Sequence, residues 1–147
     1  MKESNKYTIR LFNEWVKYGR IIIGLDFDST ISPWPSIDNM DDMQRCIKLV
    51  LRSQELGCYV IIHTSCHSER HSEIKEWCKN YDIKIDAINK NPIDLPYGKE
   101  IYSKPMCNIY LDDRAGFIES MNILEEAINL YNSYKYKQRT TFYPDVA

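Results

Sequence analysis

The sequence predicts an α/β fold, a three-layer αβα sandwich built around a central parallel sheet. Two observations support this prediction. Short runs of apolar, β-branched residues alternate along the chain with longer segments whose apolar residues recur every three to four positions. Three of the short runs also end in polar side chains, as expected where parallel strands bring their carboxyl ends to one ligand-binding edge. Right-handed βαβ connections make such a fold Rossmann-like.

The size and composition of the chain limit the class of protein. Its 147 residues fit one domain, with a core expected at about 20–131 and an aromatic, basic tail at 132–147. A net charge of −2 argues against a protein that coats nucleic acid or binds membranes through basic surface charge. The apolar runs are too short to cross a bilayer, and residues 1–6 lack an apolar signal core, so we expect a cytoplasmic protein. Five dispersed cysteines without a C-x-x-C pair indicate reduced thiols.

In the first half of the chain, two predicted helices alternate with two predicted strands. Apolar stripes at helical spacing predict the helices, and short apolar runs predict the strands. A glycine follows each helix, and Asp38 is placed to cap the second one. The expected elements are a helix at Tyr7–Tyr18, a strand at Ile21–Asp26, a helix at Asn39–Glu55 and a strand at Cys58–His63. Trp34, in a proline-stiffened loop, is either a lid over the site or a packing residue.

The second half repeats the alternation with one longer interruption. Prolines and a glycine make Asn89–Lys104 irregular. The expected elements are a helix at His67–Asn80, a short strand at Ile83–Ile88, a strand at Cys107–Leu111 and a helix at Ala115–Tyr131. The tail that follows is rich in tyrosine and lysine, and it either packs on the body or binds a partner.

The first strand ends in two acids, Asp26 and Asp28. Residues two apart in an extended chain point to the same side, so both carboxylates can face one small space. They would repel each other unless a proton or a cation intervenes, and a hard divalent cation with oxygen ligands, commonly Mg²⁺, suits them. The alternative is that Asp28 merely caps the next turn.

Two further strands end in polar residues. Thr64 and Ser65 follow the second strand, and Asp112 and Asp113 follow the fourth. The carboxyl ends of parallel strands lie at one edge of a sheet, so these side chains are expected to meet Asp26 there.

A phosphate monoester at this edge would find the groups its hydrolysis needs. Asp26, Asp112 and Asp113, with the backbone carbonyl of Asp28, can supply oxygen ligands to Mg²⁺. One carboxylate can attack phosphorus, and Asp28 can protonate the leaving oxygen. Thr64 and the amides around Ser65 are expected to hydrogen-bond the phosphoryl group. A lysine, Lys104 or in its place Lys99, is expected to stabilise the developing negative charge. Arg70 either binds the anionic substrate or is a solvated residue.

These motifs resemble those of the haloacid dehalogenase-like hydrolase superfamily. Asp26-Phe27-Asp28-Ser29-Thr30 matches its first motif, Thr64 its second, Lys104 its third and Asp112-Asp113 its fourth. The resemblance runs from about Ile21 to Ala127. It implies phosphatase chemistry with Asp26 as nucleophile, Asp28 as acid/base and Mg²⁺ as cofactor. The spaces where the family inserts a cap are short here, so we expect a capless or nearly capless form, open to a bulky substrate or covered by another subunit.

Other interpretations use the same residues. Cys66 lacks the arginine six positions later that a cysteine phosphatase needs. A zinc site from His63, Cys66, His67 and His71 lacks a second ligand pair. A binding module of the same fold, sensing phosphate or nucleotide without turnover, stays open, as does a homo-oligomer. The substrate is expected to be a small phosphorylated molecule or a phosphorylated macromolecule; a nucleic-acid end phosphatase using Lys135, Lys137 and Arg139 is less favoured.

Overall fold

A computed structural model describes residues 5–33, 39–91 and 105–142 of the chain. The predictions made for Trp34, Asp38, Lys99 and Lys104 lie outside these residues. The elements in chain order are α1 (Lys6–Tyr18), β1 (Ile22–Leu25), α2 (Met40–Glu55), β2 (Tyr59–Ile62), a 3₁₀ turn (Ser68–Arg70), α3 (His71–Asn80), β3 (Ala87–Ile88), β4 (Ile109–Leu111) and α4 (Phe117–Phe142).

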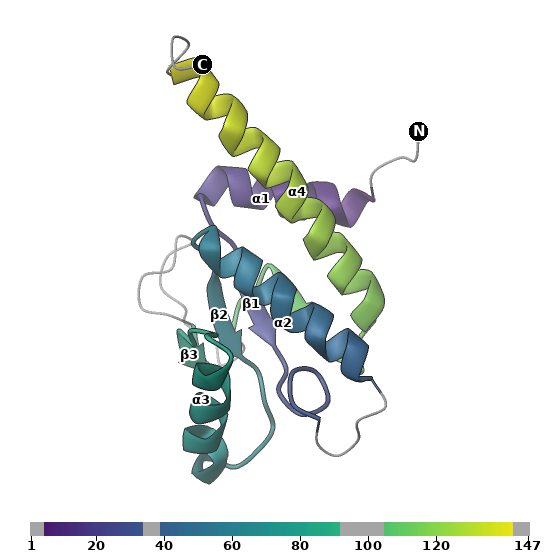
Figure 1. Cartoon of the computed structure of the whole chain (residues 1–147), viewed down its shortest axis with the longest axis vertical. Helices are drawn as coiled ribbons and strands as arrows, with labels where there is room; N and C mark the ends of the chain where they lie inside the picture. Colours follow the sequence, from purple (N-terminus) through teal and green to yellow (C-terminus); the bar gives the residue numbers. More distant parts are fainter. Residues whose placement is uncertain (1–4, 34–38, 92–104, 143–147) are drawn as a thin grey trace.

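The strands form one parallel sheet in the order β3-β2-β1-β4, which confirms the predicted α/β fold with a parallel sheet (Figure 1). The register brings the strand ends level, because Leu25 of β1 pairs with both Ile62 of β2 and Leu111 of β4. The residues that follow these three positions therefore leave the sheet at one edge, at the same height.

The two faces of the sheet are covered differently. Alternate strand residues such as Ile23, Leu25 and Val60 join buried side chains from all four α-helices in one large core. On the other face, Ile22, Ile61 and Ala87 form a small cluster that contains no residue of a described helix. Among the described residues, the helices thus lie on one face of the sheet, and the predicted third layer is not seen.

On the second face the ring of Tyr110 lies against β1 at Gly24. A Cβ atom at Gly24 would lie 2.9 Å from both Cys107 Sγ and Tyr110 Cδ1, so only glycine fits without displacing them. The ring of Tyr110 also lies beside that of His63, with centroids 5.8 Å apart.

The last helix is longer than predicted. It was expected to end near Tyr131, before a separate tail, but α4 continues to Phe142 and projects beyond the body (Figure 1). The apolar periodicity fades after Tyr131 because the helix leaves the core, whereas no proline or glycine interrupts residues 132–142.

Within the described part of the chain, no helix has both the length and the apolar character needed to cross a membrane.

Two predicted elements are shorter than expected. The strand predicted at Ile83–Ile88 pairs with β2 only at Ala87 and Ile88, because the backbone of Lys84 bonds the side chain of Gln54 instead. The helix predicted at His67–Asn80 begins with the 3₁₀ turn and becomes α-helical at His71.

Candidate functional site

Three carboxylates meet at the carboxyl edge of the sheet. Asp26 follows β1, and Asp112 and Asp113 follow β4. Each offers one oxygen, and these oxygens all lie within 4.8 Å of one another. The backbone N–H of Asp26 donates to the carbonyl of Leu111 at 2.9 Å, which extends the β1–β4 ladder into the site. The predicted meeting of these acids is therefore observed.

A tight loop carries the chain from Asp26 to Ser32. The carbonyl of Phe27 accepts backbone hydrogen bonds from three successive residues, Thr30, Ile31 and Ser32. Ser29 adopts a left-handed conformation with φ of 64°. Such a conformation is uncommon for a residue with a side chain, and here the surrounding bonds hold it.

Two side chains from the helical layer support the loop from outside. Asn39, just before α2, donates from Nδ2 to the carbonyl of Ser29 at 2.7 Å. Trp77 of α3 donates from Nε1 to the carbonyl of Ile31 at 3.1 Å, and its ring meets that of Phe27 edge-on. The position of Asp26 and Asp28 thus depends on two helices that are distant in the sequence.

Thr30 links the two acidic strand ends. Its side chain is fully buried, and its hydroxyl lies 2.8 Å from Asp26 Oδ2 and 3.2 Å from Asp113 Oδ1. The same hydroxyl accepts from the backbone N–H of Asp113 at 3.0 Å. Sequence reasoning noted Thr30 as part of a motif but assigned it no role. The residue thus joins the end of β1 to Asp113, which lies 83 positions further along the chain.

The closeness of the acids alters the protonation of Asp26. The pKa of Asp26 is raised from 3.8 to about 7, chiefly by burial; the Thr30 hydroxyl lowers it, and the neighbouring Asp112 and Asp113 contribute to the rise. The ionised form of Asp26 is thus disfavoured by low solvation and by like charge. A cation among the three carboxylates would remove the second cause and favour the ionised form.

Asp28 lies apart from the three acids and pairs with Arg70. The guanidinium Nη1 and Nη2 lie 3.1 Å and 3.2 Å from the two carboxylate oxygens of Asp28, a two-point ion pair. Arg70 comes from the 3₁₀ turn after β2, and its pKa is raised chiefly by this bond. Binding of anionic substrate by Arg70 stays a prediction; in the structure its guanidinium bonds Asp28, the predicted acid/base residue.

Thr64 and Ser65 follow β2 at the same edge. Asn89, just past β3, accepts the backbone N–H of Thr64 and donates to its carbonyl, each at 2.8 Å. The Thr64 hydroxyl accepts from the N–H of Cys66 at 3.2 Å, so it keeps its own hydrogen to donate. Asn89 was not predicted as a site residue, although it is a fourth polar residue at a strand end and could have been recognised as one.

A pocket of about 490 Å³ joins these groups. Its lining unites the acids that follow β1 and β4 with the polar residues that follow β2: Asp26, Asp28, Ser29, Thr64, Ser65, Asp112, Asp113 and Arg114. Arg114 also donates its backbone N–H to Asp112 at 2.9 Å. All the predicted metal and phosphate residues except Arg70 and the undescribed lysines therefore line one cavity.

The zinc alternative is not supported by the positions of its residues. Within residues 5–33, 39–91 and 105–142, the three aspartates are the one group of three potential ligands close enough to hold an ion. His63, Cys66, His67 and His71 form no such group in those ranges.

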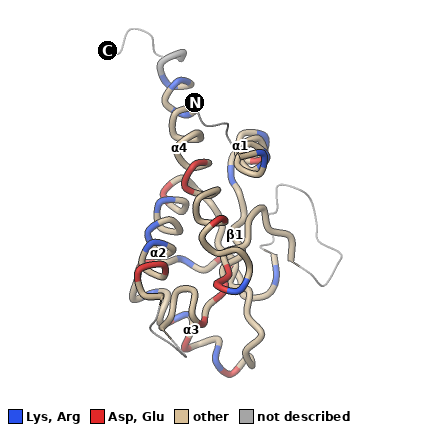
Figure 2. The backbone as a smooth tube through the Cα atoms, turned by 90° about the vertical axis from the view of Figure 1, so that its right-hand side faces the viewer, with Lys and Arg blue, Asp and Glu red and all other residues tan. Residues whose placement is uncertain are grey.

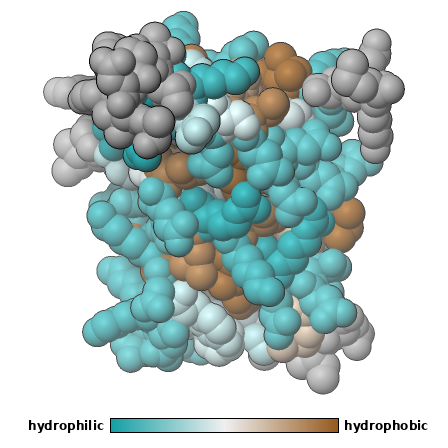
Figure 3. All heavy atoms as spheres, turned by 45° about the horizontal axis from the view of Figure 1, so that its top comes forward, coloured by the Kyte–Doolittle hydropathy of each residue, from teal (hydrophilic) through white to brown (hydrophobic). Residues whose placement is uncertain are grey.

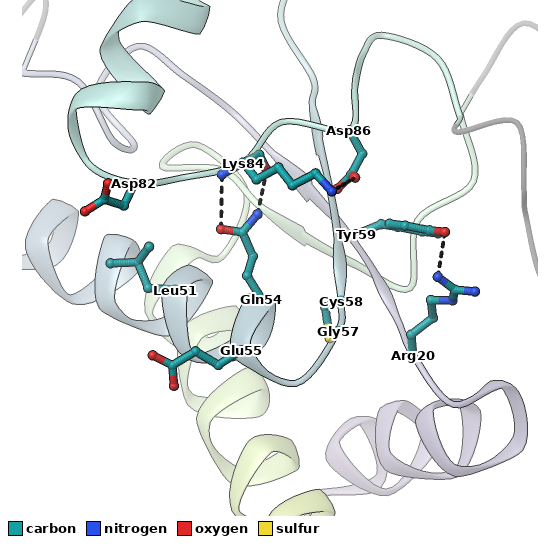
Figure 4. Close-up of a pocket in the computed structure, with 10 residues that line it drawn as sticks. All are labelled: Arg20, Leu51, Gln54, Glu55, Gly57, Cys58, Tyr59, Asp82, Lys84 and Asp86. Atoms are coloured by element: carbon teal, nitrogen blue, oxygen red, sulfur yellow. Dashed lines mark hydrogen bonds and ion pairs between the residues drawn. The ribbon is translucent and has the colours of Figure 1, made fainter.

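A larger pocket, about 760 Å³, lies at the opposite edge of the sheet (Figure 4). Several of its polar groups pair with one another: Arg20 bonds the hydroxyl of Tyr59 and lies over its ring, and Gln54 bonds the backbone of Lys84 in both directions. Asp86 accepts from the backbone N–H of Val60 at 2.8 Å. These contacts connect the N-terminal ends of the strands to the C-terminal end of α2. We therefore assign this pocket a structural role.

Comparison with protein-family models, with curated proteins and with solved structures finds no match to this chain. The function is therefore argued from the site itself.

Proposed function

We propose that the protein is a Mg²⁺-dependent phosphohydrolase that cleaves phosphate monoesters through an aspartyl-phosphate on Asp26. One observation carries the proposal: three carboxylate oxygens lie within 4.8 Å of one another in a pocket that also holds Asp28 and Thr64. Like charges this close cost stability, and a structural role would not need them. The motif resemblance to haloacid dehalogenase-like hydrolases supports the same activity.

The residues present fit a magnesium ion. Asp26, Asp112 and Asp113 offer oxygen ligands, which Mg²⁺ prefers, and the cluster is partly buried, so a bound cation would be only partly screened. When bound, Mg²⁺ supplies positive charge that favours the ionised form of Asp26 and offsets the repulsion between these carboxylates and a phosphate dianion.

The chain's own residues perform the bond changes. A carboxylate oxygen of Asp26 attacks phosphorus, a new O–P bond forms, and the P–O bond to the leaving group breaks. In its protonated form Asp28 donates a proton to the leaving oxygen; the carboxylate that results pairs with Arg70 and accepts a proton from the water that cleaves the aspartyl-phosphate. Thr30 holds the attacking carboxylate by its hydroxyl, and Arg70 holds Asp28 toward the pocket.

The other side of the pocket suits the phosphoryl group. The Thr64 hydroxyl can donate to a phosphoryl oxygen because its acceptor lone pair already serves the N–H of Cys66. Arg114 lines the same pocket and adds positive charge beside the acids. Lys104, or Lys99 in its place, is proposed to stabilise the developing charge, as the motif resemblance implies.

The direct test is hydrolysis of a generic aryl phosphate by the purified chain. We expect turnover with Mg²⁺, loss of turnover in EDTA and recovery when Mg²⁺ is restored. Rapid acid quenching followed by peptide mass spectrometry should find a phosphoryl group on the peptide that contains Asp26. Turnover that persists in EDTA, or a phosphoryl group on another peptide only, would overturn the mechanism. Mg²⁺ binding without turnover on a broad panel of phosphomonoesters would favour the binding module.

A further inference from the structure

The end of the molecule formed by α1 and the outer part of α4 is strongly basic, although the whole chain carries a net charge of −2. Residues 5–20 contain four basic side chains and one acidic one, and residues 131–139 contain three basic side chains and no acidic one. In Figure 2 the outer part of α4 carries blue bands and no red, whereas red segments lie nearer the sheet. A local positive field therefore exists that the net charge conceals.

Aromatic contacts hold the two helices together. Trp15 of α1 stacks on Tyr131 of α4 at a centroid distance of 4.5 Å, and Phe12 meets Tyr134 edge-on at 6.2 Å. The Thr8 hydroxyl donates to Glu126 at 2.9 Å. A pocket of about 400 Å³ between the helices is lined by Lys135 and Arg139 of α4, with Val16 of α1 and Gly19 just after it.

The outward side of α1 carries a pocket of about 520 Å³ with a mixed lining. Three cations and three apolar or aromatic side chains contribute to it: Lys6, Arg10, Lys17, Ile9, Tyr18 and Met106. Asn13 and Glu14 complete the lining, and Glu14 already accepts a hydrogen bond from Asn108 at 2.8 Å. Ile9 and Met106 are 38 % and 40 % exposed, so apolar surface is open between the cations.

On α1, tyrosine rings lie beside these cations. Lys6 Nζ and Arg10 Cζ lie 5.1 Å and 5.5 Å from the ring centroid of Tyr7, which is 46 % exposed. Lys17 Nζ lies 5.1 Å from the ring of Tyr18, and on α4 Tyr136 is 70 % exposed. The space-filling view toward this end is largely hydrophilic with separate hydrophobic patches, which does not suit a broad apolar protein interface (Figure 3).

We propose that the outward face of α1 binds single-stranded nucleic acid, and that the basic outer part of α4 adds to the positive field at this end of the molecule. The cations of α1 fit the phosphates of a strand, and the exposed rings and apolar pocket fit its unpaired bases. In a duplex the base faces are stacked inside the helix, so only its phosphates could contact this surface. The exposed tyrosine rings therefore favour a single strand, whose bases are free to stack on them. The acidic pocket and this surface are separate sites. Helix α4 begins at Phe117, beside that pocket, and extends about 30 Å to reach this surface, so a strand bound here does not need the pocket. The surface therefore binds independently of the proposed hydrolysis.

The test uses fluorescence anisotropy of a labelled oligo(dT) of about 15 nucleotides, the length of a single-strand site. The oligonucleotide has no terminal phosphate, and the buffer contains EDTA, so the acidic pocket cannot contribute turnover. We expect saturable binding to the full-length chain that weakens with salt. The triple variant Lys6→Gln/Arg10→Gln/Lys17→Gln should weaken binding at least about tenfold and reduce the salt slope by about 2, at about 0.7 per lost phosphate contact.

The matched control removes three exposed lysines elsewhere. Lys75→Gln/Lys79→Gln/Lys84→Gln changes the net charge equally, and these lysines also line one pocket, but without an aromatic residue. Its binding should stay within about twofold of the wild type, because long-range charge alone is screened. Tyr18→Ala should weaken binding about fivefold or more at unchanged salt slope, because it removes stacking.

The outcomes decide the proposal. Equal loss in both triple variants, equal affinity for a duplex of the same length, or binding to anionic vesicles without binding to oligo(dT) would each overturn it. If the α1 variants do not fold, as judged by circular dichroism, amide chemical shifts of the wild-type chain titrated with oligo(dT) replace them. Shifts confined to α1 and residues 131–139 support the proposal, and shifts elsewhere or none overturn it.

Discussion

The two edges of the sheet carry similar numbers of polar residues but arrange them in opposite ways. At the amino edge, Arg20 pairs with Tyr59, Gln54 with the backbone of Lys84, and Asp86 with the backbone of Val60 (Figure 4). At the carboxyl edge, Asp26, Asp112 and Asp113 bring like charges within 4.8 Å of one another. The amino-edge pocket is also the larger, at about 760 Å³ against about 490 Å³.

The difference teaches that pocket size is a poor guide to function in this fold. Complementary pairs at the amino edge stabilise the chain locally, so their removal should cost stability and nothing else. The carboxyl edge instead retains repulsion that a proton or a bound cation must relieve, which is the behaviour expected of a site kept for chemistry. Substitutions at the carboxyl edge test this distinction, and substitutions of Asp86 provide the contrast at the amino edge.

The largest expected effect is the loss of activity in Asp26→Asn. The amide cannot act as the attacking carboxylate, so kcat for an aryl phosphate should fall by at least about a thousandfold. The amino-edge variant Asp86→Asn should leave kcat unchanged, because Asp86 lies in the other pocket. Steady-state kinetics on both variants measures the difference. Comparable loss in both would remove the functional distinction between the edges.

Second in size is the effect of Asp112→Asn and Asp113→Asn on magnesium. Loss of a direct ligand should raise the half-saturating Mg²⁺ concentration by more than about a hundredfold, beyond the effect of an outer-shell residue. The Mg²⁺ dependence of activity and of thermal unfolding both report it. The acid whose replacement has the larger effect is the direct ligand. A normal Mg²⁺ dependence in both variants would contradict a metal site here.

Thr30→Val should have an intermediate effect. Valine keeps the size of the buried side chain but loses the hydroxyl that joins Asp26 to Asp113. We expect kcat to fall about tenfold to a hundredfold with KM little changed, since the hydroxyl positions a reacting group and does not contact substrate. Thr30→Ser retains the hydroxyl and should recover most of kcat. Failure of serine to recover activity would indicate a packing role instead.

The smallest expected effect is on stability as a function of pH. In the metal-free fold, the pKa of Asp26 is raised to about 7, chiefly by burial, from an ordinary value of 3.8. Below the ordinary value the residue is protonated in both states, and as the pH rises through the folded-state pKa, ionisation increasingly favours unfolding. Asp26→Asn should therefore stabilise the metal-free chain at pH 8 and give no gain near pH 4.

Urea unfolding in EDTA at the two pH values measures this gain. Asp86→Ala provides the contrast at the amino edge, because it removes the acceptor of the Val60 N–H and should destabilise the chain by about 0.5–1.5 kcal/mol. If Asp26→Asn raises the free energy of unfolding equally at both pH values, ionisation of Asp26 is not the cause of the stabilisation.

Much of the carboxyl edge could be predicted because it depends on local patterns. Alternating apolar runs and helical stripes predict parallel strands, and the polar residues directly after three strands predict a common edge. The clustering of Asp26 with Asp112 and Asp113 follows from this pattern alone. Asn89 follows the same rule directly after β3, where a strand was expected to end at Ile88, and it was nevertheless not predicted as a site residue.

The alternation of strands and helices, and the acids that end two of the strands, are properties of the sequence alone, because side-chain periodicity and strand direction are local. The tertiary structure decided what depends on distant partners: the level register at Leu25, the link through Thr30, the pairing of Arg70 with Asp28, and the placement of the helices on one face of the sheet in the described residues. It also decided that α4 continues to Phe142, since α1 supports the helix beyond the core. Contacts between residues far apart in the chain have no periodicity in the sequence, and for this reason only the folded molecule shows them.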